Sequence, residues 1–381
     1  MKKQNQKCFT FLILIDVLLL LVILLSIILI IASNKSSAEH WTTTFSRTAL
    51  YISGNLTGLV GFSIFEFIVM FGIVCIIGLI TWAVFHFVCR DFWSGVNKLL
   101  IIAIGAMTIT VSYNAVVGPT YKRKALPLNK YQGEVKREEL KEIASYFIED
   151  WNRCADQLSF DEKGEIILPY SKKELNERIK NEYKKLDNNK YFNRYTSSAK
   201  PLFLSSFFTW NGVVGIFFGP TGEAHYNSYS TNAELPFYMA HEMAHSKGVM
   251  REDDAQLVAT YICLNSEDPL LRFSVYYNTI DSIIDLTYLT GNKEDHKEVN
   301  KLIGDKVRVN SKYIYYHWKG KYILADLGDK INDWYLKTFG QKEGTTSYQD
   351  TKPSVSPVDN KIYLSNYQNI YFNNYYKNSS F

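Results

Sequence analysis

A long apolar run near the amino terminus, from Thr10 to Ala32, is almost unbroken Leu, Ile and Val. Only Asp16 and Ser26 interrupt it. Because about 20 apolar residues suffice for a helix to cross a bilayer, the run can span one. It is longer than the apolar core of a signal peptide and lacks a clear cleavage site. We therefore predict a membrane helix that is retained in the mature protein.

Two further apolar runs, about residues 67–88 and 99–117, predict a membrane region of three helices within residues 1–117. Lysines and arginines are equally numerous on the two sides of this region, so charge alone does not orient it. The first span usually dominates orientation, and a long trailing domain crosses the membrane largely regardless of its charge. We expect the amino terminus inside the cell and the remainder of the chain, from Gly118, outside the cytoplasm.

Composition limits the classes of function that the chain can have. A formal net charge of +4 over 381 residues gives no support for binding nucleic acid. Two cysteines lie beyond the membrane region, Cys154 and Cys263, and neither has a Cys-x-x-Cys spacing. They could form a disulfide in an extracytoplasmic domain or remain two buried thiols. A thiolate zinc site is not supported.

The motif His241-Glu242-Met-Ala-His245 carries the chemistry. On a helix His241 and His245 lie one turn apart on one face, so their imidazoles can share one ion. Glu242 then lies beside the ion without ligating it, where it can act as a general base toward zinc-activated water. Pro236 suits the first turn of such a helix, and Gly248 can end it.

A zinc site of this kind needs a third protein ligand, and the nearest acidic run is Glu252-Asp253-Asp254. The segment from Glu252 to Gln256 is similar to the Glu-x-x-Ala-Asp/Asn pattern of glutamate-type zincins, which implies that Glu252 is the ligand. Asp253 and Asp254 remain possible. If Glu252 faces the histidines, Gln256 lies on the same face and can hydrogen-bond a ligand histidine. Asp254 would point away, and Asp253 could pair with Arg251.

Residues 118–350 predict a soluble α+β domain that is mostly helical. Helices are expected at 137–157, 172–186, 255–264, 271–289 and 330–337. Residues 213–218 and 223–227 predict two short strands joined by a glycine turn. His225 on the second strand could line a cleft, although a histidine in such a place is more often a polar surface residue. Residues 351–381, rich in Asn, Tyr and Ser, predict a loosely attached tail.

Five segments carry a resemblance to a known family: residues 219–224, 235–248, 251–255, 272–276 and a stretch ending at Ser347-Tyr348. Together they resemble uncharacterised multi-pass bacterial membrane proteins with a zincin-like HExxH domain, of the domain-of-unknown-function 3810 type. The resemblance covers roughly Tyr113 to Tyr348, preceded by three spans. The chain departs from the family at Asp254 and Gln256, where members tend to have Glu and Asn. The resemblance implies a zincin-like fold and a zinc-dependent peptidase of unknown substrate.

We therefore expect a zinc metallopeptidase of the bacterial cell membrane, with Zn²⁺ held by His241, His245 and Glu252. Its substrate would be a peptide or a cell-wall amide. A phenol could meet the developing oxyanion, for which Tyr276 is one candidate and a buried structural tyrosine the alternative. The competing hypothesis is a non-catalytic membrane-anchored binding or assembly protein that keeps the zincin scaffold. Glu242 argues against that hypothesis, because a structural metal site needs no general base.

Overall fold

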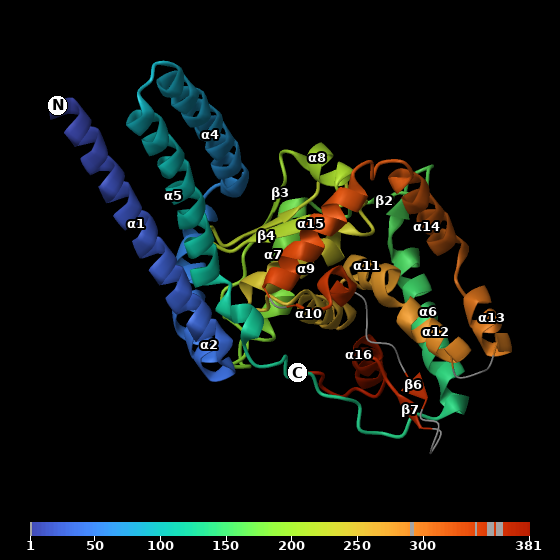
Figure 1. The fold of residues 1–381 in the computed structure, drawn as a ribbon. Coiled ribbons are helices and arrows are strands. Elements are labelled where there is room, and N and C mark those ends of the chain that lie inside the picture. The colour runs from blue at the N-terminus through green and yellow to red at the C-terminus, as the bar shows by residue number, and fades with distance from the viewer. Residues whose placement is uncertain (1, 290–292, 340, 349–353, 356–360) are drawn as a thin grey trace. The chain divides into compact units, whose positions relative to one another are not determined.

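The computed structural model describes residues 2–289, 293–339, 341–348, 354–355 and 361–381. It divides into two compact units (Figure 1). Unit 1 contains residues 1–124 together with 218–223, and unit 2 contains residues 125–217 and 224–381. Both units are mostly helical, as the sequence predicts.

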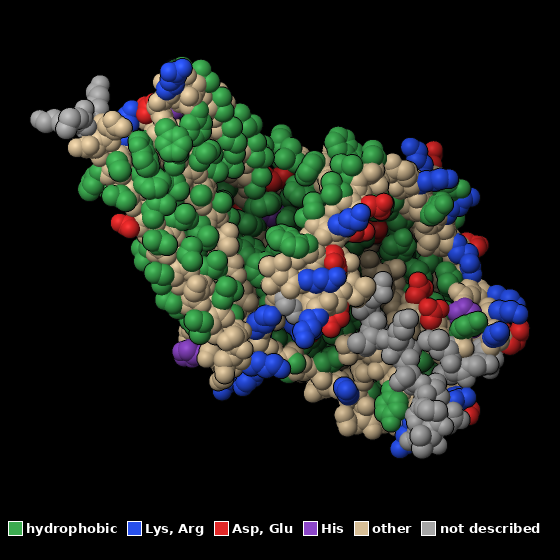
Figure 2. Space-filling model, viewed as in Figure 1, with side chains coloured by type: hydrophobic (Ala, Val, Ile, Leu, Met, Phe, Trp, Pro, Cys, Tyr) green, Lys and Arg blue, Asp and Glu red, His purple; other side chains and the backbone are tan. Residues whose placement is uncertain are grey.

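Three long apolar helices make up most of unit 1: α1 (Lys2–Ser33), α4 (Ile64–Val88) and α5 (Phe92–Val116). Each contains a segment long and apolar enough to cross a membrane. Both α1 and α4 pack against α5 (Figure 1). Hydrophobic side chains cover the outer faces of these helices (Figure 2), as expected of surfaces that face lipid. The three predicted spans are confirmed as apolar helices, each of which begins earlier in the chain than predicted.

Unit 1 also contains helical segments that the sequence pattern did not indicate, between the first two spans and after the third. These are α2 (Lys35–Trp41), the π-helix η1 (Thr42–Ser46), α3 (Arg47–Thr57) and the 3₁₀ helix η2 (Pro119–Lys122). The Asn34 side chain caps α2 by accepting hydrogen bonds from two backbone amides. These short polar segments have no long apolar period, which is why the pattern did not reveal them.

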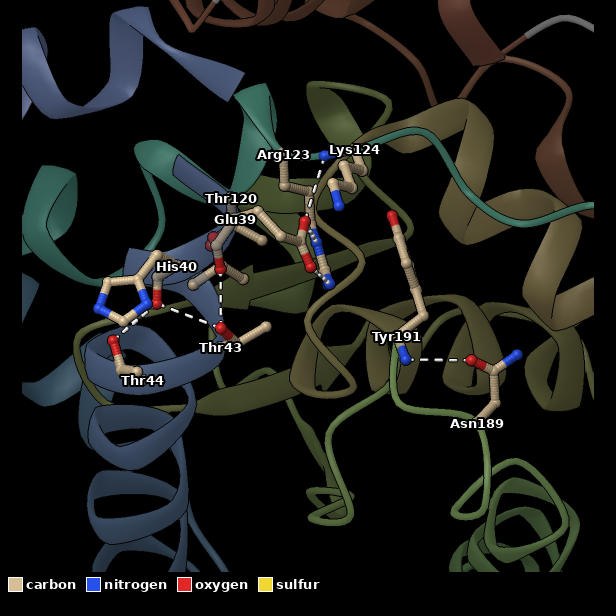
Figure 3. Close-up of polar contacts among 10 residues, drawn as sticks. Glu39, His40, Thr43, Thr44, Thr120, Arg123, Lys124, Asn189 and Tyr191 are labelled. Carbon is tan, nitrogen blue, oxygen red and sulfur yellow. Dashed lines mark hydrogen bonds and ion pairs between the residues drawn. The ribbon is translucent and has the colours of Figure 1, made fainter. Parts of the chain in front are cut away.

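An ion pair joins α2 to the segment after η2. The guanidinium of Arg123 donates to both carboxylate oxygens of Glu39, at 2.7 and 3.0 Å (Figure 3). Burial tends to raise the pKa of Glu39, but Arg123 and the backbone amide of Lys124 hold it below its usual value. A bidentate pair of this kind fixes the relative orientation of the two segments.

The turn between the two predicted strands, residues 218–223, belongs to unit 1. The Glu223 carboxylate accepts hydrogen bonds from the amides of Ile64 and Phe65, at 3.0 and 2.9 Å. These amides lie at the start of α4, where a negative charge also complements the helix dipole. In addition, the Thr57 hydroxyl donates to the carbonyl of Thr221 at 3.0 Å. The turn is thereby bonded to both α3 and α4.

Unit 2 contains all the other described helices. It also contains the strands, except for Phe218 at the end of one strand and Glu223 at the start of the next, which belong to unit 1. The helices are α6 (Arg137–Gln157), α7 (Lys172–Lys184), α8 (Ser205–Trp210), α9 (Leu235–Ser246), α10 (Glu252–Leu264), α11 (Pro269–Thr279), α12 (Asp281–Leu289), α13 (Lys293–Lys301), α14 (Asp305–Trp318), α15 (Ala325–Thr338), the 3₁₀ helix η3 (Gly344–Tyr348) and α16 (Asn366–Tyr375). A three-stranded sheet has the order β3 (Ala199–Pro201), β5 (Glu223–Tyr226), β4 (Gly215–Phe218), with β3 and β5 parallel. Two antiparallel pairs complete the set: β1 (Ser159–Phe160) with β2 (Ile166–Ile167), and β6 (Ser354–Val355) with β7 (Ile362–Tyr363).

The core of unit 2 lies around α9, which packs against α7, α10 and α11. Tyr183 of α7 is fully buried, and its hydroxyl donates to the carbonyl of Ala240 in α9 at 2.6 Å. The predicted helix 137–157 is confirmed as α6. The predicted helix 271–289 is wrong as one element, because the chain breaks at Ile280 into α11 and α12. Ile280 is itself buried, so the apolar period runs through the break and conceals it.

The prediction of a loosely attached tail is wrong for residues 361–381; residues 351–353 and 356–360 lie outside the described part of the chain. Helix α16 begins with a capping box between Ser365 and Gln368 and packs against α10 and α12. Ile370 and Phe372 are buried in the core of unit 2. The segment looks polar because it contains many Asn residues. Asn369 and Asn373 bond backbone groups far away in the chain, while only a few positions carry the apolar contact.

Replacing Ile370 by Ala should lower the free energy of unfolding by about 2–5 kcal/mol, because it leaves a cavity in a closed core. The change can be measured on the full chain as reduced resistance to proteolysis during thermal or denaturant unfolding. Asn378→Ala is the control, since that side chain is exposed. Equal stability of the two variants would show that α16 does not belong to the core.

Candidate metal centre

Helix α9 places both histidines of the motif on one face. Pro236 lies in its first turn, and Gly248, with φ +83°, reverses the chain just after its last residue. That backbone conformation is rarely adopted by residues other than glycine. The rings of His241 and His245 lie 5.0 Å apart between centroids and are nearly perpendicular. Both side chains are buried.

Glu252, the first residue of α10, meets these two histidines. Its Oε2 lies 3.0 Å from Nε2 of His241 and 3.6 Å from Nε2 of His245. One ligand atom from each of the three residues lies within 4.8 Å of the others. The structure therefore brings together the three side chains that the sequence predicts as metal ligands.

The donor set fits a zinc ion in both spacing and chemistry. Ligand atoms about 2.0–2.2 Å from a tetrahedral ion lie roughly 3.3 Å from one another. The two separations between the carboxylate and the imidazole nitrogens, 3.0 and 3.6 Å, lie on either side of that value. Two imidazoles and one carboxylate are also a usual protein set for zinc with an open fourth position.

The other two acidic residues of the run point elsewhere. The Arg251 guanidinium binds Asp253 at 2.7 Å and lies 3.5 Å from a carboxylate oxygen of Asp254. The expected pairing of Asp253 with Arg251 is therefore confirmed. The backbone amide of Glu252 is covered by the side-chain oxygen of Gln341, at 3.3 Å. These contacts hold the start of α10 so that Glu252 alone turns toward the histidines.

Neighbouring groups set the protonation of the cluster. The Nδ1 of His245 lies 2.7 Å from the Val249 carbonyl, which orients the ring and leaves Nε2 facing Glu252. Burial lowers the pKa of His245 to about 4, so the ring is neutral at neutral pH. Burial tends to raise the pKa of Glu252, but His245 and His241 hold it below its usual value. A neutral imidazole and an ionised carboxylate are the forms that bind a metal.

His241 differs from His245 in its second nitrogen. Burial tends to lower the pKa of His241, but hydrogen bonding to Glu252, with a smaller contribution from Gln256, raises it above the usual value. Neither Nδ1 of His241 nor Oε1 of Gln256 has a hydrogen-bond partner of good geometry. Gln256 lies beside His241, on the helix face that the sequence predicts. From there its side chain can orient the imidazole ring.

Glu242 is buried next to the cluster but is not one of its three ligands. Burial raises the pKa of its carboxyl to about 8, with a further contribution from Glu252. Gly215 of β4 lies against it: a Cβ at that position would be 2.5 Å from Oε1 of Glu242. Any larger residue there would displace the Glu242 carboxylate from this position. On the same strand, the Phe217 ring lies 5.6 Å from the His245 ring.

A family model described as a protein of unknown function, DUF3810, matches residues 41–352. The chain belongs to the DUF3810 family. The match includes α4 and α5 as well as all of the candidate metal centre, so it extends further toward the amino terminus than the resemblance over Tyr113 to Tyr348. No curated protein and no solved structure shows a significant match to the chain.

The structure of this DUF3810 member adds a phenol that sequence reasoning missed. Tyr348, in η3, interacts with Glu252, and its ring centroid lies 6.3 Å from that of His241. Burial raises its pKa well above the usual value, and Glu252 adds to the effect, so the hydroxyl keeps its proton. Asn332 of α15 donates to the same hydroxyl at 3.4 Å. Tyr348 lies in one of the five segments that carry the family resemblance, which is the feature of the sequence that could have indicated it.

The structure of this DUF3810 member also shows where Tyr276, His225 and the two cysteines lie. The hydroxyl of Tyr276 donates to Asp150 at 2.6 Å, so this tyrosine is the buried structural one that we weighed as the alternative. His225 is fully buried, with Nδ1 3.1 Å from the Ile216 carbonyl, so the expectation of a surface residue is wrong. Cys154 and Cys263 are two buried free thiols.

Proposed function

We propose that this DUF3810 protein is a membrane-anchored zinc-dependent peptidase with a zincin-like unit 2. The observation that supports this function best is the buried carboxylate of Glu242, which lies beside a three-residue ligand cluster without belonging to it. A purely structural zinc site uses four protein ligands and has no need of such a group. The cluster His241, His245 and Glu252 would hold the ion.

When bound, zinc would supply Lewis-acid activation of a water molecule and of the carbonyl to be attacked. Glu242 would accept the proton of the attacking water and deliver it to the leaving nitrogen. A pKa raised to about 8 by burial suits a group that must both take and return a proton near neutral pH. The protonated Tyr348 hydroxyl would donate to the oxyanion that develops on the substrate.

The strand β4 offers a place for an extended substrate. It is an outer strand of the sheet with order β3, β5, β4, and its residues are only partly buried. An extended peptide can add to such an edge by backbone hydrogen bonds. Because Gly215 and Phe217 of this strand touch Glu242 and His245, a peptide paired there would run past the candidate metal centre. This arrangement favours a peptide or a peptide-like cell-wall amide as substrate.

The function can be tested on the full chain reconstituted in lipid vesicles. We expect about one zinc per chain in the wild type and little in His241→Ala. The zinc-loaded wild type should cleave either unstructured peptides or cell-wall peptides, lose this activity with a chelator, and regain it when zinc is added. Zinc at background level in wild type and His241→Ala alike would refute the metal site. Zinc binding without cleavage of either substrate would instead favour a binding or assembly protein.

We also propose that the segment from Gly118 to Phe381 lies outside the cytoplasm. The basis is the amino-terminal lysines, which favour an inside location, and the three spans that follow. Ser379 is exposed, so Ser379→Cys is a suitable reporter. A membrane-impermeant thiol reagent should label it in intact cells. A native-cysteine background without the substitution is the control, and labelling only after permeabilisation would reverse the topology.

A further inference from the structure

Unit 2 exposes large apolar side chains on and just before α8. Phe203 is 80% exposed, Phe207 52% and Trp210 46%, values far above those usual for aromatic residues in a soluble domain. Phe207 and Trp210, three residues apart, lie on one side of α8, and Phe203 lies in the turn that leads into this helix. Figure 2 shows hydrophobic side chains over α8 on the viewed face.

Helix α15 and the turn just before it expose a second set of large apolar side chains. Ile323 is 70% exposed, Ile331 56% and Trp334 68%. Ile331 and Trp334 lie three residues apart on one side of α15, whereas Leu336, on another side of this helix, is fully buried. The helix therefore has one apolar side that packs into unit 2 and a separate apolar side that faces outward.

The two sets form one surface, because α8 and α15 lie next to each other. The backbone amide of Leu324 donates to the Trp210 carbonyl at 2.7 Å. A Cβ on Gly328 would meet the Asn211 carbonyl oxygen at 2.2 Å, so the two backbones are in close contact. We call the six exposed side chains the α8–α15 surface: Phe203, Phe207, Trp210, Ile323, Ile331 and Trp334.

We propose that the α8–α15 surface is an interfacial membrane-contact site, which dips into the headgroup–acyl boundary of the bilayer that the three helices of unit 1 cross. A membrane is always within reach, because the chain joins unit 2 directly to unit 1 at three places, between residues 124 and 125, 217 and 218, and 223 and 224. Bilayer lipid is thus present at a high effective concentration, which a free partner protein would not match.

The chemistry of the surface fits this occupant. Tryptophan and aliphatic side chains on one face are typical of segments that lie in the membrane interface, where indole rings prefer the headgroup level. The exposed charged residues next to these side chains in the chain are of both signs, Lys319 and Lys330 with Asp326 and Asp329. The lysines are long enough to reach phosphate groups while their stems lie along apolar side chains. Asn332 of the same helix bonds Tyr348, so contact at α15 would bring the candidate metal centre close to lipid headgroups.

The test uses the purified full chain in vesicles of phosphatidylcholine and phosphatidylglycerol, with photoreactive benzoylphenylalanine in place of Trp334 or Phe207. Mass spectrometry after illumination identifies what each position touches. Two matched controls are the same replacement at Val74 of α4, 67% exposed on a membrane helix, and at Lys297 of α13, whose side chain is 67% exposed. Equal protease resistance of all variants shows that they fold.

We expect lipid adducts at positions 334 and 207 in yields near that of position 74 and at least about tenfold above position 297. Adducts that join two copies of the chain would overturn the proposal in favour of self-association. Yields at 334 and 207 as low as at 297 would overturn it as well, because the surface would then face water. Neither readout depends on zinc or on hydrolysis, so the proposed function stands or falls separately.

Discussion

Glu252→Ala should weaken zinc binding by more than about 100-fold, the upper end of the losses seen when a residue that merely orients a ligand is removed. The carboxylate is placed between the two imidazoles, at 3.0 and 3.6 Å, and no other described side chain is grouped with them as a third donor. Without it, two histidines would share an ion that prefers at least three protein ligands. Titration of the full chain with zinc, in competition with a chelator of known affinity, measures the effect.

Asp254→Ala is the matched control, because it removes an acidic residue two positions away. Its carboxylate lies near Arg251 rather than the histidines, so most of the zinc affinity should remain. The opposite pattern, with zinc retained in Glu252→Ala and lost in Asp254→Ala, would show that α10 begins with a different helix phase in solution. Comparable losses in both variants would point to a general effect on folding.

Glu242→Gln should reduce hydrolysis by about 10²–10⁴-fold, the usual contribution of a general base, and leave zinc binding within a few-fold of wild type. Glutamine has the shape of glutamate but cannot accept and return a proton at neutral pH. Because the glycine at position 215 leaves room beside Glu242 and glutamine has the same size, the amide should take the same place. Initial rates and zinc content are measured on the same preparations.

The control is Glu294→Gln, a carboxylate that is 67% exposed on α13 and should leave the rate unchanged. Loss of zinc in Glu242→Gln would mean that this residue is a ligand and not a base. An unchanged rate with zinc in place would remove Glu242 from the reaction and would leave the proposed mechanism without its proton acceptor.

The three long apolar helices and the helix that carries the two histidines could be predicted because their signals are local. A bilayer-length apolar run needs no knowledge of the rest of the fold, since its hydrogen bonds are internal to the helix. Likewise, the spacing of His241 and His245 fixes their common face as soon as the segment is helical. The choice of Glu252 came from its similarity to the zincin pattern, and the helix phase then predicted that Asp254 would point away.

Long-range contacts supplied what local patterns could not. Residues 361–381 read as a tail because their apolar residues are few, yet Ile370 and Phe372 fill gaps in a core made by helices far earlier in the chain. The break at Ile280 could not be seen in the sequence because this residue is apolar and buried, so it continues the apolar pattern of the helices on either side. In both cases the packing of the core decides the structure, and no local periodicity reports it.

The sequence by itself determined that this chain has three helices long and apolar enough to cross a membrane, and that one helix presents two histidines and a glutamate in a metal-binding pattern. Those conclusions depend on side-chain spacing along a single helix, which the backbone geometry fixes. Only the tertiary structure decided that Gly215 makes room for Glu242 and that the Tyr348 phenol reaches Glu252. Both contacts join segments that are distant in sequence, and their geometry exists only after the core has packed.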